Sequence, residues 1–346
     1  MHLALFGAAL SLVASVAASS FPHTHSNHVR TASGHASTEE TIPSYFSGNC
    51  TKDNMTIRKE WRHLSKVQQN DFLDAVQCLM DKPAKSGLTA TTSRFSDLQA
   101  LHRGMTNTAY ADIIHHVGQF LPWHRYYMHI YETLLRDECG YTGSIPWWDE
   151  VKDADSGDMW GSSMWGADAF GGNGTGSGNC VQDGRFANYT LHIGPGDEDT
   201  DYCLRRAFDS EAISNANSTV LKMCNSYNTF SPWWNCISDI PHKGVHTYIG
   251  GVMSDIKSSP GDPVFFMHHM YIDRVWWLWQ KQDPANRLYD ISGPTLNETA
   301  NVEPAGGWQN ATLHYELSSF NIMPNTTIGK VMNPQGGYLC YGYDSE

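Results

Sequence analysis

Positively charged residues are scarce in this sequence. Its 346 residues include 23 Lys and Arg against 36 Asp and Glu, which gives a formal net charge of −13. Lys and Arg form no cluster, and neutralising nucleic-acid phosphates requires a basic surface, so a nucleic-acid partner is excluded. Apolar residues make up 40% and aromatic residues 12%. These fractions are sufficient for a sizeable core and exclude disorder of the chain as a whole.

Long hydrophobic runs are also scarce. The one such run, residues 3–18, lies at the N-terminus and is too short to span a membrane comfortably. It ends in Val16-Ala17-Ala18, a small-residue pattern typical of signal-peptide cleavage. We therefore predict a signal peptide over residues 1–18, a secreted protein and no membrane partner. Residues 19–44 are rich in Ser, Thr and His without periodicity, which predicts a flexible leader in preference to a metal-binding tract.

The eight cysteines include no C-x-x-C pair. In an exported chain, an even number of separated cysteines predicts up to four disulfides in preference to zinc ligation. The sequence does not determine the pairing, but we expect Cys78 with Cys139, joining two core helices, and Cys50 with Cys340, joining the chain ends. Eight N-x-Ser/Thr acceptors predict N-glycans at the surface: Asn49, Asn54, Asn173, Asn188, Asn217, Asn297, Asn310 and Asn325.

Helical periodicity and end signals predict a mainly α fold. Four helices are expected, over residues 56–79, 122–139, 242–248 and 262–282. Pro122 suits a first helical turn, Gly140 a helix end, and Asp262-Pro263 a cap followed by proline. Residues 157–201 are rich in Gly, Asn and Asp, and short β-prone pieces follow residue 290. The expected architecture is a four-helix bundle core wrapped by long loops with a few short strands.

Histidine is the unusual component, with 17 residues. His242 and His246 are four residues apart, so both rings project from one helical face and can share a metal ion. His115 and His124 would point to opposite sides of one helix, but a new helix beginning at Pro122 allows them to converge. His268 and His269 are adjacent and diverge by about 100° on a helix, so only one of them should bind directly.

A set of neutral imidazoles without Cys or carboxylate suits copper well, and zinc or iron acceptably. Calcium and magnesium are disfavoured because they prefer oxygen ligands. Two groups of three histidines suggest two metal ions, although the number of histidines alone also fits three mononuclear sites. Lys243 stands where the zinc-protease motif requires Glu, which excludes that motif.

Four segments together resemble the copper-binding regions of tyrosinases and catechol oxidases, in particular short secreted fungal forms. HHVGQFLPWHRYYMHIYETLLRDECGY (residues 115–141) and IPWWD (145–149) resemble the first region, and PHKGVHTYIGG (241–251) and DPVFFMHHMYIDRVWWLWQ (262–280) the second. The resemblance covers most of residues 56–285. It implies a tyrosinase-like catalytic domain over residues 45–346 that holds two copper ions in a dinuclear type 3 site.

The resemblance also implies roles for individual residues. It places the copper A ligands at His102, His115 and His124, and the copper B ligands at His242, His246 and His269. His116 competes with His102 if the loop is shifted, and His268 is expected to orient its neighbours. Phe265 is expected to pack between the copper-bearing helices, and Asp273 and Arg274 to form a structural pair.

The implied reaction oxidises o-diphenols to o-quinones with O2, with the phenol stacked on His246. In relatives that hydroxylate monophenols well, Asn commonly follows the first copper B histidine. Lys243 stands there, and a cation cannot accept the hydrogen bond of a water molecule. Asp239, on the same helical face, either partly substitutes or caps the helix. Ile256 occupies the gate position above copper A, which suggests an accessible site.

We therefore expect a catechol oxidase with weak monophenol hydroxylation. The alternatives are a true tyrosinase, including a tailoring enzyme for a phenolic natural product, and a hemocyanin-like oxygen carrier. Turnover of a catechol separates an enzyme from a carrier. A third alternative is a copper-free, disulfide-stapled binding module, which would contain well under two coppers per chain.

Overall fold

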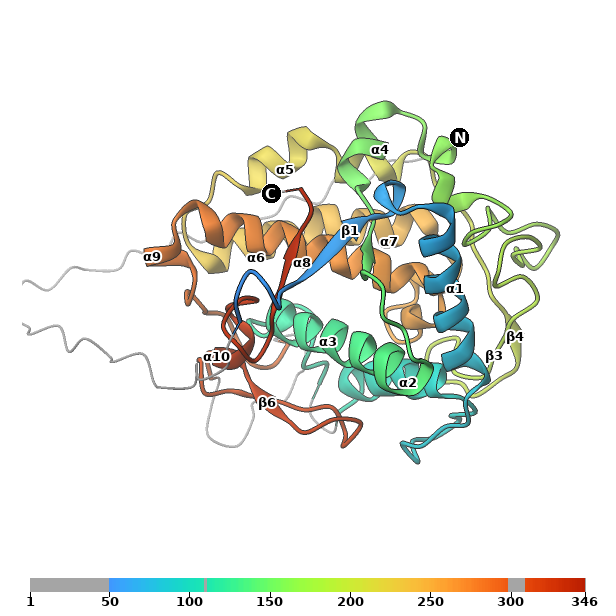
Figure 1. Ribbon diagram of the computed structural model, residues 1–346, viewed down its shortest axis with the longest axis horizontal. Coiled ribbons are helices and arrows are strands. Elements are labelled where there is room, and N and C mark those ends of the chain that lie inside the picture. The colour runs from blue at the N-terminus through green and yellow to red at the C-terminus, as the bar shows by residue number, and fades with distance from the viewer. Residues whose placement is uncertain (1–49, 109–110, 298–308, 346) are drawn as a thin grey trace, which may run out of the picture. The chain divides into compact units, whose positions relative to one another are not determined.

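The computed structural model describes residues 50–108, 111–297 and 309–345. The predicted signal peptide and leader, and the acceptor Asn49, lie outside these residues. The described residues all belong to one unit, Ser44–Glu346. In it, helices form the interior and the strands are few and short, which confirms the predicted mainly α fold (Figure 1).

Most residues are buried in each of four helices: α2 (Arg94–Thr106), α3 (Phe120–Cys139), α7 (Lys243–Ile249) and α8 (Val264–Gln282). Helix α3 packs directly against α8, and α1 (Lys66–Asp81) covers α2 and α3. Local sequence explains the helix ends. Ser93 and Ser96 form a reciprocal cap at the start of α2, and Gly140 ends α3 with a φ of 67°, a left-handed conformation that favours glycine.

The predicted helix over residues 56–79 was wrong in its first part. Residues Thr56–Glu60 form strand β1, which pairs in parallel with β2 (Pro146–Trp147) and β7 (Tyr341–Tyr343). Tertiary pairing overrides the helical periodicity because Arg58 on β1 is buried and forms ion pairs with Glu132 and Asp273. In addition, α2 was not predicted, α3 begins at Phe120 ahead of Pro122, and α7 is preceded by a π-helical turn, η5 (Ser238–His242).

The remaining elements are short. The helices are α4 (Glu150–Ser156), α5 (Ser218–Cys224), α6 (Phe230–Ile237), α9 (Pro284–Arg287) and α10 (Ile328–Val331). Short 3₁₀ turns lie at Trp61–His63, Met159–Gly161, Ser163–Trp165, Ala212–Ala216, Gly251–Ser254 and Ser259–Gly261. Two antiparallel pairs complete the strands of the described residues: β3 (Thr190–Leu191) with β4 (Tyr202–Cys203), and β5 (Glu316–Leu317) with β6 (Thr326–Thr327).

Asp273 on α8 lies at the centre of a buried polar network. It forms ion pairs with Arg58 and with Arg125 of α3, and it accepts hydrogen bonds from the hydroxyls of Tyr341 and Tyr343. Burial alone would raise the pKa of Asp273, but Arg125 and Arg58 hold that pKa below its usual value. The expected pair of Asp273 with Arg274 was wrong.

Arg274 lies on the other side of α8. Its guanidinium donates to the backbone carbonyl of Ser345 and lies over the ring of Trp147. Asp273 and Arg274 therefore contact different residues, because adjacent side chains on a helix diverge.

All eight cysteines form disulfides. Cys78–Cys139 joins α1 to the end of α3 and Cys50–Cys340 joins the two ends of the described chain, so both predicted pairs are confirmed. The other two are Cys180–Cys203 and Cys224–Cys236. No helix among the described residues is long and apolar enough to cross a membrane.

The predicted irregular segment from residue 157 onward is anchored by one buried arginine. Both side chains of the Arg206–Asp262 ion pair are fully buried, with N–O distances of 2.7 and 2.9 Å. Arg206 also donates to the backbone carbonyls of Phe170 and Gly171. Asp262 accepts from the backbone N–H of Val264, the first residue of α8. The long loop and the start of α8 are thus held by the same ion pair.

Candidate metal centre

Seven histidines gather in two groups at the centre of the helical core. Within each group, one ring nitrogen of every histidine lies within 4.8 Å of those of the others. The first group contains His102, His115 and His124, and the second contains His242, His246, His268 and His269. All six residues predicted as ligands therefore lie in these two groups. His116 lies in neither, because its half-exposed side chain turns away to Asp239.

The first group is assembled by α2, a loop and the N-terminal part of α3. Asp112 organises the loop: its carboxylate accepts from the backbone N–H groups of Ile114 and His115, and also contacts Nδ1 of His115 at 2.8 Å. His115 lies in the loop before α3, and His124, the fifth residue of that helix, lies one turn after Phe120, so the two rings can converge as expected. The role of Asp112 was not predicted, although its spacing of three residues from His115 could have indicated it.

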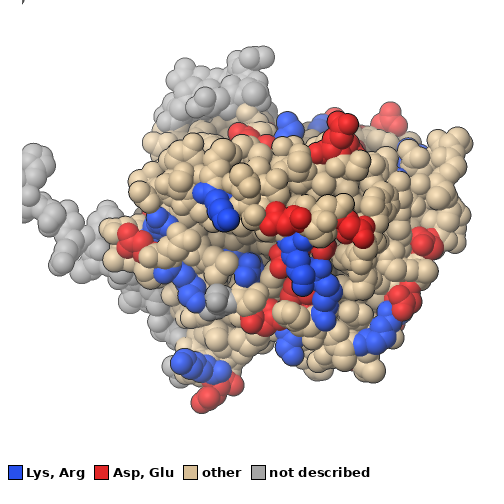
Figure 2. Space-filling model, turned by 90° about the horizontal axis from the view of Figure 1, so that it is seen from above, with Lys and Arg blue, Asp and Glu red and all other residues tan. Residues whose placement is uncertain are grey.

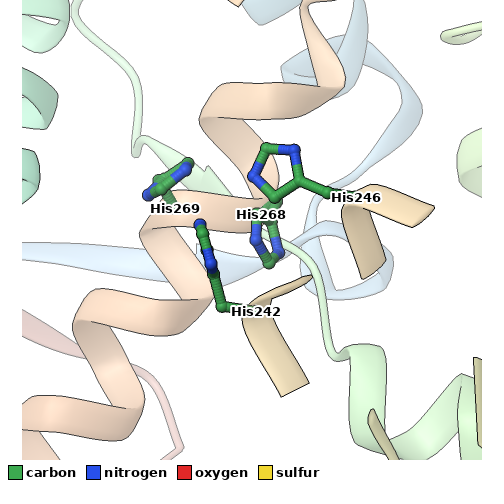
Figure 3. Close-up of side chains that lie close together, drawn as sticks. All are labelled: His242, His246, His268 and His269. Atoms are coloured by element: carbon green, nitrogen blue, oxygen red, sulfur yellow. The ribbon is translucent and has the colours of Figure 1, made fainter. Parts of the chain in front are cut away.

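The second group is assembled by η5, α7 and α8 (Figure 3). His242 donates from Nδ1 to the carbonyl of Ser238 at 3.2 Å, and His246 donates from Nδ1 to the carbonyl of Met253 at 2.7 Å. In the first group, His124 donates in the same way to the carbonyl of Phe120 at 2.8 Å. Because a carbonyl only accepts, the proton lies on Nδ1 and each Nε2 presents a lone pair.

The buried Nε2 atoms of His124 and His242 have no protein partner. Buried Nε2 atoms without a hydrogen bond belong to His102, His124, His242, His268 and His269. Burial lowers the pKa of all five rings well below the usual value, and it lowers the pKa of His246 to about 4. The rings are therefore neutral at neutral pH, as metal ligands must be. Unpartnered buried polar atoms need an explanation, and neutral imidazoles without thiolates suit copper.

His268 and His269 diverge from adjacent positions on α8, as predicted. The ring of His269 stacks on His124 of the first group, with centroids 4.4 Å apart and planes 11° apart, so it faces the junction of the two groups. Nδ1 of His268 contacts the carboxyl group of Glu150 at 2.6 Å, and both side chains are fully buried. Burial, followed by the charges of Asp149 and Asp153, raises the pKa of Glu150 well above its usual value. No local pattern in the sequence indicates Glu150.

Phe265 lies where the two groups meet. Its ring centroid is 4.1 Å from that of His269, 5.4 Å from that of His102 and 5.8 Å from that of His246. An aromatic ring between the copper-bearing helices was expected, and this contact set places it there. The apolar ring fills space that water would otherwise occupy between the histidines.

A cavity of about 250 Å³ opens beside the second group. It is lined by His115, His116, Ser238, His242, Lys243, His246, Thr247, Met253, Ser254, Ile256 and Ser259. Ile256 is 46% exposed at the cavity wall, in agreement with an accessible site. Asp239 does not line the cavity, and its carboxylate lies 3.4 Å from Nδ1 of His116. Outside the cavity, Asp239 is not placed to hold a water molecule for a phenol. It also caps no helix, since the residue before η5 is Ile237.

Comparison with known proteins agrees with this geometry. Residues 92–282 match the family model described as the common central domain of tyrosinase. The tyrosinase-like protein phomQ1 of Diaporthe leptostromiformis is 33% identical, over 83% of this chain and 77% of its own length. The N-acetyl-6-hydroxytryptophan oxidase ivoB of Emericella nidulans is 29% identical, over 85% of this chain and 94% of its own.

Solved structures show the same relationship. A variant of the polyphenol oxidase of Thermothelomyces thermophila superposes with a TM-score of 0.72 at 30% identity, covering 86% of this chain and 90% of that one. A functional unit of octopus hemocyanin shares the fold, with a TM-score of 0.55 at 20% identity, covering 84% of this chain and 68% of that one. The matched family model spans all seven clustered histidines. The chain therefore belongs to the tyrosinase family of copper oxidoreductases.

Proposed function

We propose that the protein is a secreted dicopper catechol oxidase, which oxidises o-diphenols to o-quinones with O2 and hydroxylates monophenols weakly. The observation that carries the proposal is the pair of adjoining histidine groups, in which the buried Nε2 atoms of five rings have no protein partner. His102, His115 and His124 would hold copper A, and His242, His246 and His269 would hold copper B. His268 would orient the second group through its contact with Glu150.

When bound, the copper pair supplies the redox chemistry, by which two electrons pass from the diphenol to O2. The chain positions the substrate. The cavity reaches His246, whose ring is fixed by its hydrogen bond to the Met253 carbonyl and can stack on a phenol ring. Ile256 and Met253 provide apolar wall. A cavity of about 250 Å³ is smaller than the ~300–1,000 Å³ typical of drug-sized ligands, which favours substrates with a single ring.

The preference for diphenols rests on the residue that follows His242. Lys243 lines the cavity and cannot accept a hydrogen bond from a water molecule that would take the proton of a monophenol. Asp239, the other acceptor considered for that water, is directed to His116. Neither side chain therefore supports efficient removal of the phenol proton.

Two further observations bear on location and on the kind of substrate. The four disulfides favour an oxidising compartment, and the acceptors Asn54, Asn188, Asn310 and Asn325 are exposed, as N-glycosylation requires. One relative is named for oxidation of a hydroxylated tryptophan derivative, which supports a tailoring reaction on a phenolic natural product as the second candidate.

The test combines metal analysis with paired substrates. We expect two coppers per chain, rapid oxidation of 4-tert-butylcatechol and slow oxidation of 4-tert-butylphenol. Comparable rates on both would indicate a true tyrosinase. Two bound coppers without catechol turnover would indicate an oxygen carrier, and well under two coppers per chain would contradict the proposed dinuclear site.

A further inference from the structure

The cavity beside the second histidine group is lined by one Lys or Arg side chain, that of Lys243, and by no acidic side chain of the described residues. The Lys243 side chain is exposed, on the first turn of α7. The cavity therefore has a cation at its solvent side and apolar groups, Ile256 and Met253, in its wall.

The ammonium group of Lys243 also has no ion-pair partner among the described residues, whereas the nearby cations Lys257 and Arg103 are paired with Asp197 and Asp199. Asp239, one helical turn before Lys243, could have neutralised it but instead pairs with His116 at 3.4 Å. An ammonium left free beside a ligand cavity retains its charge and three donors for a bound molecule.

The positive charge of Lys243 is opposite in sign to the net charge of the chain. The net charge of the chain is −13, and the face in Figure 2 shows acidic and basic side chains interspersed. A surface of negative net charge repels anions, so an unpaired lysine at the cavity changes the sign of the field locally. The surface as a whole thus gives no general attraction for anions, and any preference for them must come from the site.

We propose that Lys243 is a specificity residue that binds an anionic substituent, a carboxylate, on the side chain of a single-ring phenolic substrate. This inference rests on the proposed function. The ring lies against Ile256 and Met253 toward the histidines, and because the cavity is small, the substituent extends toward the rim where Lys243 lies. The expected substrates are phenolic acids.

The size of the effect follows from exposure. Solvent-exposed ion pairs change an equilibrium constant by about 1.5- to 5-fold, and salt weakens them. A preference of this size is large enough to measure but too small to be the sole determinant of binding. Reversing the charge replaces attraction by repulsion, so its effect must exceed that of removing the charge.

The test compares 3-(3,4-dihydroxyphenyl)propanoic acid with its methyl ester, which has the same ring and no charge. For the copper-loaded protein, the acid-to-ester ratio of kcat/KM should fall about 2- to 5-fold in Lys243→Met and further in Lys243→Glu. Lys243→Arg should keep the ratio, and high salt should reduce it in the native protein. Lys222→Met, an exposed lysine on α5 that does not line the cavity, is the matched control and should leave the ratio unchanged. An unchanged ratio in both Lys243→Met and Lys243→Glu would overturn the proposal.

A binding measurement separates this proposal from the proposed function. If the copper-loaded protein oxidises neither compound, the proposed oxidase activity fails. Binding of 3-phenylpropanoate and its methyl ester, which lack the phenol, is then compared by ligand-detected NMR. Weaker binding of the acid relative to the ester in Lys243→Glu would still support the role of Lys243, and equal binding ratios in the native and variant proteins would refute it.

Discussion

Replacement of Arg206 by Met should lower the free energy of unfolding by about 3–5 kcal/mol, the usual cost of removing one partner of a buried ion pair. Asp262 would keep its charge in a fully buried position, without the two N–H groups that now contact its carboxylate at 2.7 and 2.9 Å. The carbonyls of Phe170 and Gly171 would also lose their donor. Met replaces the aliphatic stem of Arg but not its guanidinium group, so the main change is the loss of charge and of hydrogen bonds.

The free energy of unfolding is measured by urea denaturation of the metal-free, disulfide-bonded protein. The native protein and the variant are compared provided that their m-values are equal. Arg185→Met provides the control, because Arg185 pairs with Asp74, whose side chain is 62% exposed, and exposed pairs contribute at most about 1 kcal/mol. The double variant Arg206→Met/Asp262→Leu should be less destabilised than the sum of the two single variants, because no lone charge remains. A cost for Arg206→Met no larger than that for Arg185→Met would refute the reasoning.

Three further predictions concern the metal centre. Lys243→Asn should raise the rate on monophenols more than the rate on diphenols, measured with 4-tert-butylphenol and 4-tert-butylcatechol; equal changes would remove the reason for assigning Lys243 to that selectivity. His102→Gln should lose one copper per chain by metal analysis whereas His116→Gln keeps both, and the opposite pattern would exchange their roles. The metal-free protein should lose stability below about pH 6.5, because its histidines, including His246 with a pKa of about 4, bind fewer protons than they do in the unfolded chain. The loss should approach about 1.4 kcal/mol per pH unit for each such histidine, and a urea midpoint that is flat between pH 7 and 5 would contradict it.

Elements could be predicted from the sequence where local signals agree with tertiary structure. Gly140 ends α3 as predicted, and the start at Phe120 in place of Pro122 is a small shift, because the proline is accepted anywhere in the first turn. Prediction failed for residues 56–60, because the strand there buries the charged side chains of Arg58 and Glu60, which a pattern of apolar residues does not register. The partners that stabilise this strand, β2 and β7, are far away in sequence, and no local pattern reveals them.

The candidate site shows the same division. All six predicted ligands lie in the two histidine groups. They could be predicted because the spacing of His242 and His246, and the family motifs, are local properties of the sequence. Helix α2, which carries His102, was missed because nearly every side chain in it is buried, so it has little amphipathic contrast. Glu150 was missed because its contact with His268 spans 118 positions and depends on the packing of α4 against the core.

The bond between Cys50 and Cys340 makes almost the whole described chain a single covalent ring, since the two residues are 290 positions apart. A protease that cuts the long irregular segment once would open this ring without releasing a fragment. The histidine-bearing helices would remain tethered on both sides of the cut, and Cys78–Cys139 and Cys180–Cys203 add smaller rings within the large one. A nicked molecule would thus migrate as one species until it is reduced, and it could persist in protease-rich surroundings where an open chain would come apart.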